Sequence, residues 1–400
     1  MPGSGQPRER SGSVALPFTS NAVGTTPGST APQHSAPAGD GVLRHARIGS
    51  MHLETGGYLP SVTLAYETWG SLNEDGGNAV LVAHALTGST HVARGSSQED
   101  GWWDALVGPG KTVDTDRYFV VSINMLGGCY GSTGPSSPDE QGLPWGSRFP
   151  FVTVRDSVRA EARLADQLGI RAWHTVLGGS LGGARALEWA ATEPGRVQRC
   201  AVIACTAASS AEQIAFGQAQ LEAIRLDPDF NGGDYYNGRA PLAGLGLARR
   251  IAHITYRSEA ELEHRFGNDA QLKEDPLGSV LSAKRGRYAV ESYLDHQASK
   301  LGSRFDANSY LLLTEALMSH DVARGRGSVR QALANVEAEF FIAAVDSDRL
   351  YLPQHSFELA AALPGQTDVH MISAPIGHDG FLTEIEQIGV PLRERFFGAA

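Results

Sequence analysis

Residues 175–190 read TVLGGSLGGARALEWA, and this stretch decides the fold class. It begins as an apolar strand-forming run and ends in helix-forming residues, and Gly178, Ser180 and Gly182 form a G-x-S-x-G motif between the two. A nucleophile at such a sharp strand-to-helix turn occupies strained backbone, so small residues two positions before and after it prevent collisions with the neighbouring strand and helix. The motif therefore predicts that Ser180 is a nucleophile.

The helix after Ser180 adds to this prediction. Its first backbone amides point toward the place where an oxyanion forms during attack, so we expect the Leu181 amide to be one oxyanion donor. The alternative to a nucleophilic serine is a glycine-rich turn with no catalytic role, because a bare G-x-S-x-G motif also arises by chance. A phosphate-binding loop is disfavoured, since the G-x-x-x-x-G-K-[ST] pattern is absent.

Short apolar runs predict the sheet that carries this turn. Each is followed by a glycine-rich loop or a helical pattern, as is typical of buried parallel strands. The runs cover residues 78–86, 118–126, 173–180, 199–207 and 338–347, and an alternating pattern at 45–70 predicts antiparallel strands and hairpins before them. Together with the serine turn they predict an α/β-hydrolase fold with a mostly parallel sheet.

Two long stretches lie outside this sheet. Residues 1–42 are rich in Gly, Ser, Pro, Thr and Ala and nearly free of large apolar side chains, so we expect a disordered tail. Residues 208–330 separate the last two strands, and their apolar residues at helical spacing predict an inserted helical cap. The core would then consist of residues 43–207 and 331–400. The clearest helical patterns in the cap lie at 210–227, 258–267, 290–305 and 307–321.

In this fold the acid and the base of a catalytic triad follow the serine in that order. Asp346 and Asp348 come directly after the strand-forming sequence AEFFIAAV, and His378 lies in the later sequence GHDG. We expect His378 to take the proton of Ser180 and a carboxylate to orient the imidazole ring. Asp348 is preferred, because it lies deeper in the loop with Pro353 closing the turn, whereas Asp346 could cap the turn.

His84 is the competing histidine. It follows the strand-forming residues AVLVA but lies upstream of Ser180, so it suits a role in shaping the oxyanion loop better than the role of a base. In hydrolases this loop supplies the second oxyanion donor, which we assign to the Leu86 amide. A plain strand-to-loop turn is the alternative for residues 83–91.

Composition narrows the class of function. A formal net charge of -11 and the lack of a basic stripe argue against a nucleic-acid partner. No apolar run reaches the roughly 18 residues that cross a bilayer, and the N-terminus lacks the apolar segment of a secretory signal. The 3 cysteines have neither disulfide-framework nor zinc-site spacing. We therefore expect a soluble protein of the reducing cytoplasm, without a membrane partner or a metal site.

Several further segments occur in a fixed order along the chain. They are AYETWGSLN (65–73), NAVLVAHALTG (78–88), GGCYGSTGPSS (127–137), RFPFVTVRD (148–156), GGSLGGARALEWA (178–190), DSDRLYLP (346–353) and GHDGFL (377–382). Together they resemble the homoserine O-acetyltransferase family over about residues 43–396, and the three triad residues match that family's triad. The resemblance implies acetyl-CoA as donor, L-homoserine as acceptor, no bound cofactor, a homodimer, and a place in methionine biosynthesis.

The resemblance also implies how the amino-acid substrate is held. Asp379 matches a residue that contacts this substrate, and a carboxylate there would pair with an α-ammonium group. Arg249 matches the arginine that holds the α-carboxylate by a bidentate pair, although its neighbour Arg250 could be mistaken for it. Without the resemblance both arginines would be taken as solvated charges on a helix. Tyr256 lies one helical face from Arg249 and is expected either to line the pocket or to pack.

The chain departs from the commonest family pattern at Leu181, where methionine often follows the serine, and at Met125 and Tyr130. Donor and acceptor stay open, because pocket side chains set that choice and related enzymes use succinyl-CoA, accept serine or acetylate a secondary metabolite. An esterase or a non-catalytic binding protein could also be built on the same scaffold. The clamp of Arg249 and Asp379 argues against an esterase, and the complete triad argues against a binding protein.

Overall fold

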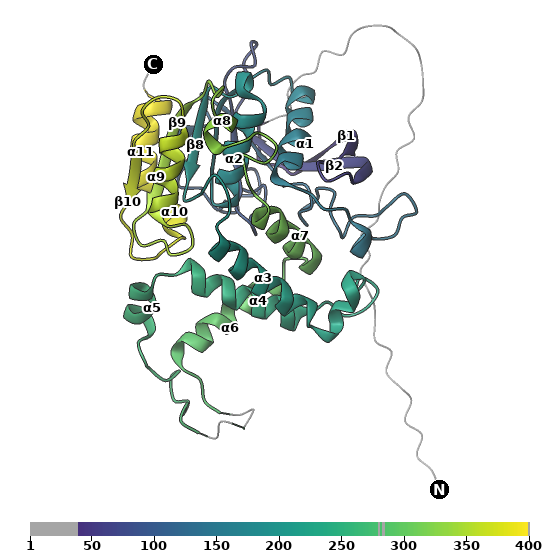
Figure 1. Ribbon diagram of the computed structural model, residues 1–400, viewed down its shortest axis with the longest axis vertical. Helices are drawn as coiled ribbons and strands as arrows, with labels where there is room; N and C mark the ends of the chain where they lie inside the picture. The colour runs from purple at the N-terminus through teal and green to yellow at the C-terminus, as the bar shows by residue number, and fades with distance from the viewer. Residues whose placement is uncertain (1–38, 279–280, 282–284, 399–400) are drawn as a thin grey trace. The chain divides into compact units, whose positions relative to one another are not determined.

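A computed structural model describes residues 39–278, 281 and 285–398 of the chain (Figure 1). The predicted disordered tail therefore lies outside the described residues for positions 1–38. For residues 39–42 the prediction is wrong, because Asp40 forms an antiparallel bridge with Trp69 and an ion pair with Arg44. Residues 39–42 therefore join the sheet rather than the predicted tail.

A mixed sheet forms the centre of the described residues. Its strand order is β1-β2-β6-β3-β7-β8-β9-β10, in which β1 and β2 pair antiparallel, β2 and β6 pair antiparallel, and the remaining neighbours pair parallel. All five predicted parallel strands and the predicted antiparallel start are confirmed. The strands are β1 (Arg44–His52), β2 (Tyr58–Trp69), β3 (Ala79–Ala83), β6 (Phe119–Ile123), β7 (Trp173–Gly179), β8 (Arg199–Ile203), β9 (Glu339–Val345) and β10 (Val369–Ile372), and a separate small pair is formed by β4 (Val107–Gly108) and β5 (Val113–Asp114).

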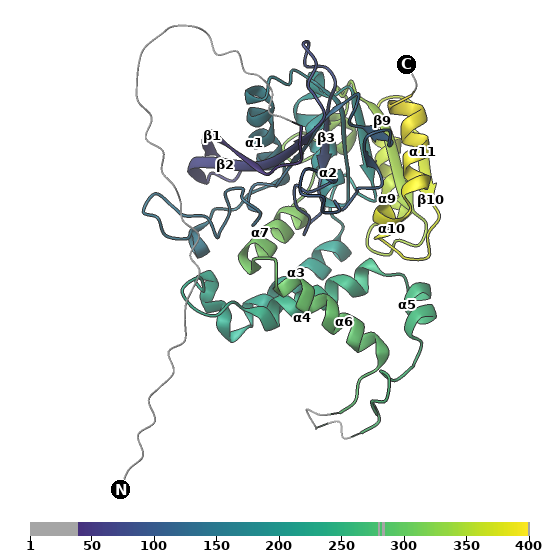
Figure 2. The same cartoon turned by 180° about the vertical axis from the view of Figure 1, so that it is seen from behind.

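Helices cover both faces of this sheet, which explains why its central strands are apolar on both sides. α1 (Val154–Gln167), α2 (Leu181–Thr192) and α9 (Pro353–Ala362) bury residues in one apolar core, whereas α11 (Ile385–Phe396) and the loop around Trp103 bury residues in the core on the other face. Figures 1 and 2 show α1 and α2 near the central strands, and α9 and α11 beside β9 and β10. The shorter elements are α8 (Val329–Ala332), α10 (Gly380–Thr383) and the 3₁₀ turns η1 (Gly146–Arg148), η2 (Pro194–Arg196) and η3 (Pro228–Gly233).

Further helices lie between β8 and β9 and form a layer beyond the carboxyl ends of the parallel strands. In Figures 1 and 2 α3, α4 and α6 lie together, and α7 lies between them and the sheet. The helices are α3 (Ala211–Arg225), α4 (Leu242–Tyr256), α5 (Glu259–Phe266), α6 (Ala289–Gly302) and α7 (Ala307–Met318). Only α4 lacked a clear helical pattern, because Gly244 and Gly246 weaken its propensity.

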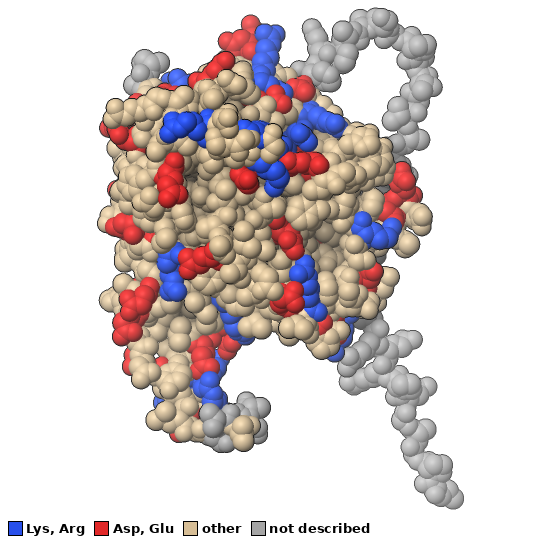
Figure 3. Space-filling view, in the orientation of Figure 1, with Lys and Arg blue, Asp and Glu red and all other residues tan. Residues whose placement is uncertain are grey.

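We call these helices, α3 to α7, the cap. The sheet and the cap belong to one compact unit, and the division into residues 43–207, 208–330 and 331–400 stays a prediction. On the face drawn in Figure 3, basic and acidic side chains are interspersed and no continuous basic region is seen. No helix of the described residues is both long and apolar enough to span a membrane.

Candidate active site

Ser180 lies in the turn between β7 and α2 with φ 57° and ψ -125°, a left-handed conformation that is strained for a residue with a side chain. Its amide donates to the Ile203 carbonyl oxygen at 3.0 Å, which ties the turn to the neighbouring strand. A Cβ atom on Gly178 would lie 2.5 Å from the Gly182 carbonyl oxygen, and one on Gly182 would collide with the Ala83 carbonyl oxygen. The two glycines therefore make room for the turn that presents the serine.

His378 and Asp348 meet beside this turn. Nδ1 of His378 lies 2.6 Å from Oδ2 of Asp348, and both side chains are buried. The other carboxylate oxygen of Asp348 accepts hydrogen bonds from the Leu350 and Tyr351 amides at 2.9 Å each. These three bonds fix the carboxylate, so Nε2 is the ring nitrogen of His378 left for proton transfer.

The charge state of His378 follows from its surroundings. Burial lowers the pKa of His378, but the charge of Asp348, its hydrogen bond to the ring, and the charge of Asp379 outweigh burial, so the pKa is raised above its ordinary value. A base with a raised pKa binds a proton more readily. The environment therefore stabilises the imidazolium ion that would form during attack.

Aromatic rings enclose His378, and sequence reasoning missed two of them. Tyr351 stacks on the imidazole with a centroid distance of 5.1 Å, and Phe381 meets it edge-on at 5.4 Å. Tyr256, which was predicted to line the pocket or to pack, lies 5.7 Å away. Burial raises the pKa of Tyr351 well above its ordinary value, opposed in part by a hydrogen bond with the Ser180 side chain. Tyr351 thus contacts both the histidine and the serine as a neutral phenol.

The two competing residues lie elsewhere. Asp346 is exposed and accepts hydrogen bonds from the Ala374 amide at 3.0 Å and the Ser373 hydroxyl at 2.8 Å, so it holds the loop after β10. His84 is buried, and its Nε2 accepts from the Met125 amide at 3.0 Å. Burial, with help from a nearby arginine, lowers the pKa of His84 to about 3. A neutral His84 therefore links the loop after β3 to the loop after β6, and its role in shaping the oxyanion loop stays a prediction.

The two predicted oxyanion donors are the amides of Leu86 and Leu181. Leu181 is the first residue of α2, so its amide has no partner within the helix. Across the described residues neither amide donates to another protein group. Both residues are buried, so these donors lie in a site with little water.

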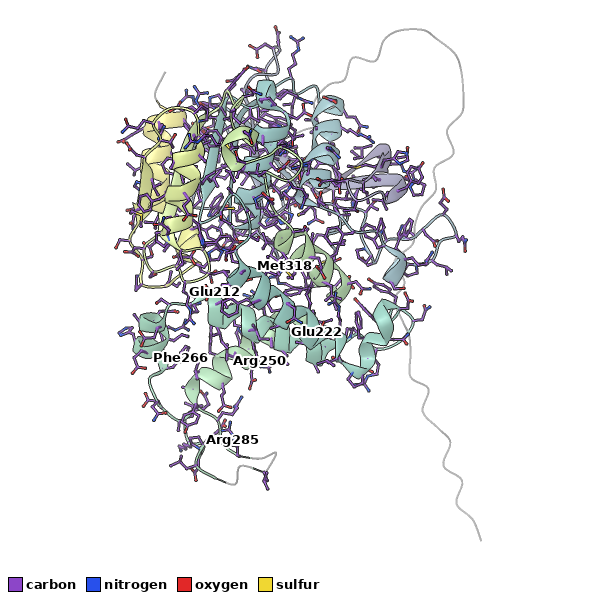
Figure 4. The ribbon with its side chains drawn as sticks, viewed as in Figure 1. Glu212, Glu222, Arg250, Phe266, Arg285 and Met318 are labelled. Carbon is purple, nitrogen blue, oxygen red and sulfur yellow. The ribbon has the colours of Figure 1, made fainter. Side chains whose placement is uncertain are left out.

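A small cavity of ≈ 40 Å³ lies beside the triad. Leu86, Tyr256 and Tyr351 form its inner wall, and Gly217 of α3 and Met318 of α7 are among the residues that close it. Figure 4 labels Met318 at the end of α7 that faces α3. We call this space the inner cavity.

Arg249 and Arg250 differ in their partners. Arg250 donates to Asp295 of α6 at 2.8 Å and lies among the cap helices, where Figure 4 labels it. The guanidinium of Arg249 lies 5.8 Å from the ring centroid of Tyr256, and its buried Nε atom has no hydrogen-bond partner. Within the described residues Arg249 pairs with no carboxylate. Arg249 therefore has a free guanidinium near the triad, and Arg250 does not.

Asp379 is not free. Its Oδ2 lies 3.2 Å from Nη2 of Arg257, the residue that ends α4. Sequence reasoning missed Arg257, because an ion pair across so many residues leaves no local pattern. Arg257 also donates from Nε to the Tyr293 hydroxyl at 3.0 Å. The second oxygen of the Asp379 carboxylate has no protein partner in the described residues.

Thiols and metal-binding groups are further sources of catalytic chemistry in proteins. The cysteines Cys129, Cys200 and Cys205 are all unpaired. Burial raises the pKa of each of the three thiols, which makes them poor nucleophiles at neutral pH. Within residues 39–278, 281 and 285–398 no group of three or more His, Cys, Asp or Glu side chains could hold a metal ion.

A serine on a strained strand-to-helix turn, with a histidine and an aspartate at the carboxyl ends of later strands, defines an α/β hydrolase, and residues 78–384 match the family model of the alpha/beta hydrolase fold. The crystal structure of homoserine O-acetyltransferase from Bacillus anthracis superposes with a TM-score of 0.83 at 28% identity, covering 90% of this chain and 98% of that one. The crystal structure of esterase E22 gives 0.81 at 26% identity, covering 88% and 99%.

Curated relatives narrow the family. The chain is 57% identical over 347 residues to homoserine O-acetyltransferase of Thermobifida fusca, covering 86% of this chain and 90% of the relative. It is 50% identical over 354 residues to homoserine O-acetyltransferase of Corynebacterium diphtheriae, covering 88% and 94%. The chain belongs to the homoserine O-acetyltransferase family.

Proposed function

We propose that this enzyme transfers the acetyl group of acetyl-CoA to the hydroxyl of L-homoserine, which gives O-acetyl-L-homoserine and CoA for methionine biosynthesis. The observation that carries the proposal is the free guanidinium of Arg249 beside the triad in a chain of this family. The buried Nε atom of Arg249 lacks a hydrogen-bond partner, and an α-carboxylate would supply a bidentate partner for the guanidinium.

In the first half of the reaction Nε2 of His378 takes the proton of Ser180 as Oγ attacks the thioester carbonyl. The oxyanion is stabilised by the amides of Leu86 and Leu181. As the tetrahedral intermediate collapses, the C–S bond breaks and the CoA sulfur receives the proton from His378. An acetyl ester remains on Ser180, and Asp348 holds the ring throughout.

In the second half L-homoserine enters with its α-carboxylate on Arg249 and its α-ammonium group on the free oxygen of Asp379. His378 takes the proton of the substrate hydroxyl, whose oxygen attacks the acetyl carbonyl. Collapse breaks the ester bond to Ser180, and Oγ recovers its proton from His378. Each step uses side chains and backbone amides of the chain, with acetyl-CoA as co-substrate, so we propose that no bound cofactor or metal takes part.

The inner cavity supports acetyl rather than succinyl as the transferred group. Its walls are formed by neutral side chains, so a terminal carboxylate would lose its hydration there without gaining a cation. A methyl group has neither the charge nor the bulk that would oppose entry. Acetyl-CoA is therefore the donor that fits, and homoserine or serine O-succinyl transfer is the alternative.

An acetyl esterase is the second candidate, because esterase E22 and an acetylester hydrolase from Corynebacterium glutamicum are similar in fold. The latter gives a TM-score of 0.75 at 29% identity over 89% of this chain and 96% of that one. Water would replace homoserine in the second half of the reaction. The burial of Ser180 and His378 opposes this candidate, since it limits the access of water to the ester.

We further propose a homodimer in the cytoplasm. Leu242, Leu247 and Ile254 are exposed apolar residues of α4 and would be covered by a second subunit. Three unpaired cysteines suit a reducing compartment.

The experiment that tests this function is CoA release from purified enzyme with acetyl-CoA or succinyl-CoA, each with L-homoserine, L-serine or no acceptor. Rapid release with acetyl-CoA plus L-homoserine alone supports the proposal. Equal release without an acceptor would favour the esterase, and preference for another pair would keep the mechanism but change the substrates. Ser180→Ala serves as the control for release that does not depend on the triad.

A further inference from the structure

A second and larger cavity, of ≈ 800 Å³, lies beside the later residues of the oxyanion loop, 83–91, which we also call the oxyanion turn. Thr87 and Gly88 line this outer cavity, whereas the preceding residue, Leu86, lines the inner cavity. The two cavities thus end at the same turn. A substrate that reaches Ser180 through the outer cavity would leave its remote part there.

Two cations of the cap, Lys300 and Arg304, line the outer cavity and are exposed. Arg304 donates from Nη1 to the Thr87 carbonyl oxygen at 2.9 Å and to the Tyr130 hydroxyl at 2.6 Å, both of which are uncharged. In the described part of the chain neither cation pairs with a carboxylate. Their charges are therefore uncompensated, in a chain whose net charge is -11.

Several other cap arginines are paired, unlike Lys300 and Arg304. Four arginines that lie on or beside α3, α5 and α6 each meet an acidic side chain at 3.0 Å or less. These pairs are Arg225 with Glu222, Arg265 with Glu261, Arg285 with Glu291 and Arg287 with Glu274. Unpaired cations that lie together at a cavity suit an anionic ligand.

Two acidic residues, Glu67 and Glu99, also line the outer cavity. Glu67 accepts from the Thr90 hydroxyl at 2.5 Å and lies 2.9 Å from Nδ1 of His91. Although burial lowers the pKa of His91, its contacts with Glu67 and Glu99 raise it overall. The other acidic residue, Glu99, is exposed to solvent.

Tyr130 connects these cations to the active site. Burial raises the pKa of its hydroxyl, while the charges of Arg304 and Arg249 act in the opposite direction. Arg249 in turn lies over Tyr256, which contacts His378.

We propose that Lys300 and Arg304 bind the phosphate groups of the acyl-CoA donor, so that the outer cavity holds the nucleotide end of the donor while its thioester reaches Ser180. The inference rests on the proposed function, since it takes acetyl-CoA as the donor. The chemistry that it requires is a charge-assisted hydrogen bond from an ammonium or a guanidinium to phosphate oxygens. Through Arg304, which holds the Thr87 carbonyl, a bound phosphate would also stabilise the oxyanion turn.

The test compares two donors that differ only in the nucleotide, acetyl-CoA and the phosphate-free S-acetylpantetheine. For Lys300→Gln and for Arg304→Gln we expect kcat/KM with acetyl-CoA to fall about tenfold relative to kcat/KM with S-acetylpantetheine, as expected for loss of one charge-assisted contact. Lys273→Gln, which removes an exposed cation outside the cavity, should leave this ratio unchanged. The ratio of the two kcat/KM values falls only if phosphate binding is lost. A general disturbance of the turn would lower both values alike.

An equal loss with both donors, or no loss with either, would overturn the proposal. Calorimetric binding of CoA and of pantetheine to Ser180→Ala provides a measurement that needs no turnover. In the Ser180→Ala background, the preference for CoA over pantetheine should disappear when Lys300→Gln and Arg304→Gln are both introduced. If the wild-type enzyme released no CoA from acetyl-CoA, the proposed function would fail, whereas a CoA preference that depends on the two cations would still support the phosphate site.

Discussion

Oδ2 of Asp379 lies 3.2 Å from Nη2 of Arg257, so the cap is tied directly to the loop that carries His378. The backbone adds to this link, since Arg257 forms an antiparallel bridge with Gly377 and the Ser258 amide donates to the Ile376 carbonyl oxygen at 3.3 Å. The end of α4 therefore positions both the catalytic base and the carboxylate that would receive the substrate ammonium.

Replacing Arg257 should loosen this link. Both side chains of the ion pair are mostly buried, so Arg257→Met leaves a partly buried carboxylate unpaired and should lower the free energy of unfolding by about 1–2 kcal/mol. Arg395→Met, which removes an exposed ion pair with Glu339, should cost under about 0.5 kcal/mol. Urea unfolding of both variants checks the difference, and equal values would show that the Arg257 pair is not important for stability.

The roles of the two neighbouring aspartates can be separated. Asp348→Asn removes the charge that orients His378 and should lower kcat by about 10³–10⁴-fold, as in other triads. Asp346→Asn changes a carboxylate that only holds the exposed Ser373–Ala374 backbone and should retain most activity. Steady-state kinetics on both variants provides the test. A severe loss in Asp346→Asn with little loss in Asp348→Asn would reverse the assignment.

The loss of activity at low pH should reflect the protonation of His378. The pKa of His378 is raised, and only the neutral ring can accept the serine proton, so activity is lost as the pH falls through a midpoint above the roughly 6.5 of a free histidine. The quantity to measure is kcat/KM for acetyl-CoA, which in a ping-pong reaction does not depend on the acceptor. Asp379→Asn removes one charge that raises the pKa and should move the midpoint to lower pH. A midpoint below about 6 in the wild-type enzyme would contradict this assignment.

Arg249 and Arg250 form a matched pair for testing acceptor binding. Arg249→Met should raise KM for L-homoserine at least about tenfold, because a bidentate contact with the carboxylate is lost. Its kcat/KM for acetyl-CoA should change far less, since the acceptor takes no part in the first half of the reaction. Arg250→Met removes only the pair with Asp295 and should leave KM for L-homoserine near the wild-type value. If Arg250→Met raised KM for L-homoserine and Arg249→Met did not, Arg250 would be the residue that binds the carboxylate.

Much of the fold could be predicted from local sequence. The apolar runs form β3, β6, β7, β8 and β9, because strands that are buried on both faces need continuous apolar residues. The strained turn at Ser180 was also predictable, since Gly178 and Gly182 are required by contacts within the same short segment. Chain order was enough to bring Asp348 and His378 together, because the carboxyl ends of parallel strands meet at one edge of the sheet.

What could not be predicted depends on contacts between distant segments. Arg257 reaches Asp379 from the cap, and neither residue carries a local signal for the other. Tyr351 lies only three residues after Asp348, but its stacking on His378 depends on how the two loops meet. The lack of a partner for Arg249 is likewise a property of the assembled cap, so only the family resemblance separated it from Arg250.

The covalent acetyl-enzyme is the centre of this account, and intact-protein mass spectrometry tests it most directly. Enzyme mixed with acetyl-CoA in the absence of an acceptor should gain one acetyl group, mapped to the peptide that contains Ser180, and should lose it rapidly when L-homoserine is added. Ser180→Ala should gain none. Full activity in Ser180→Ala, or an acetyl group that L-homoserine discharges no faster than water does, would contradict the proposed transfer.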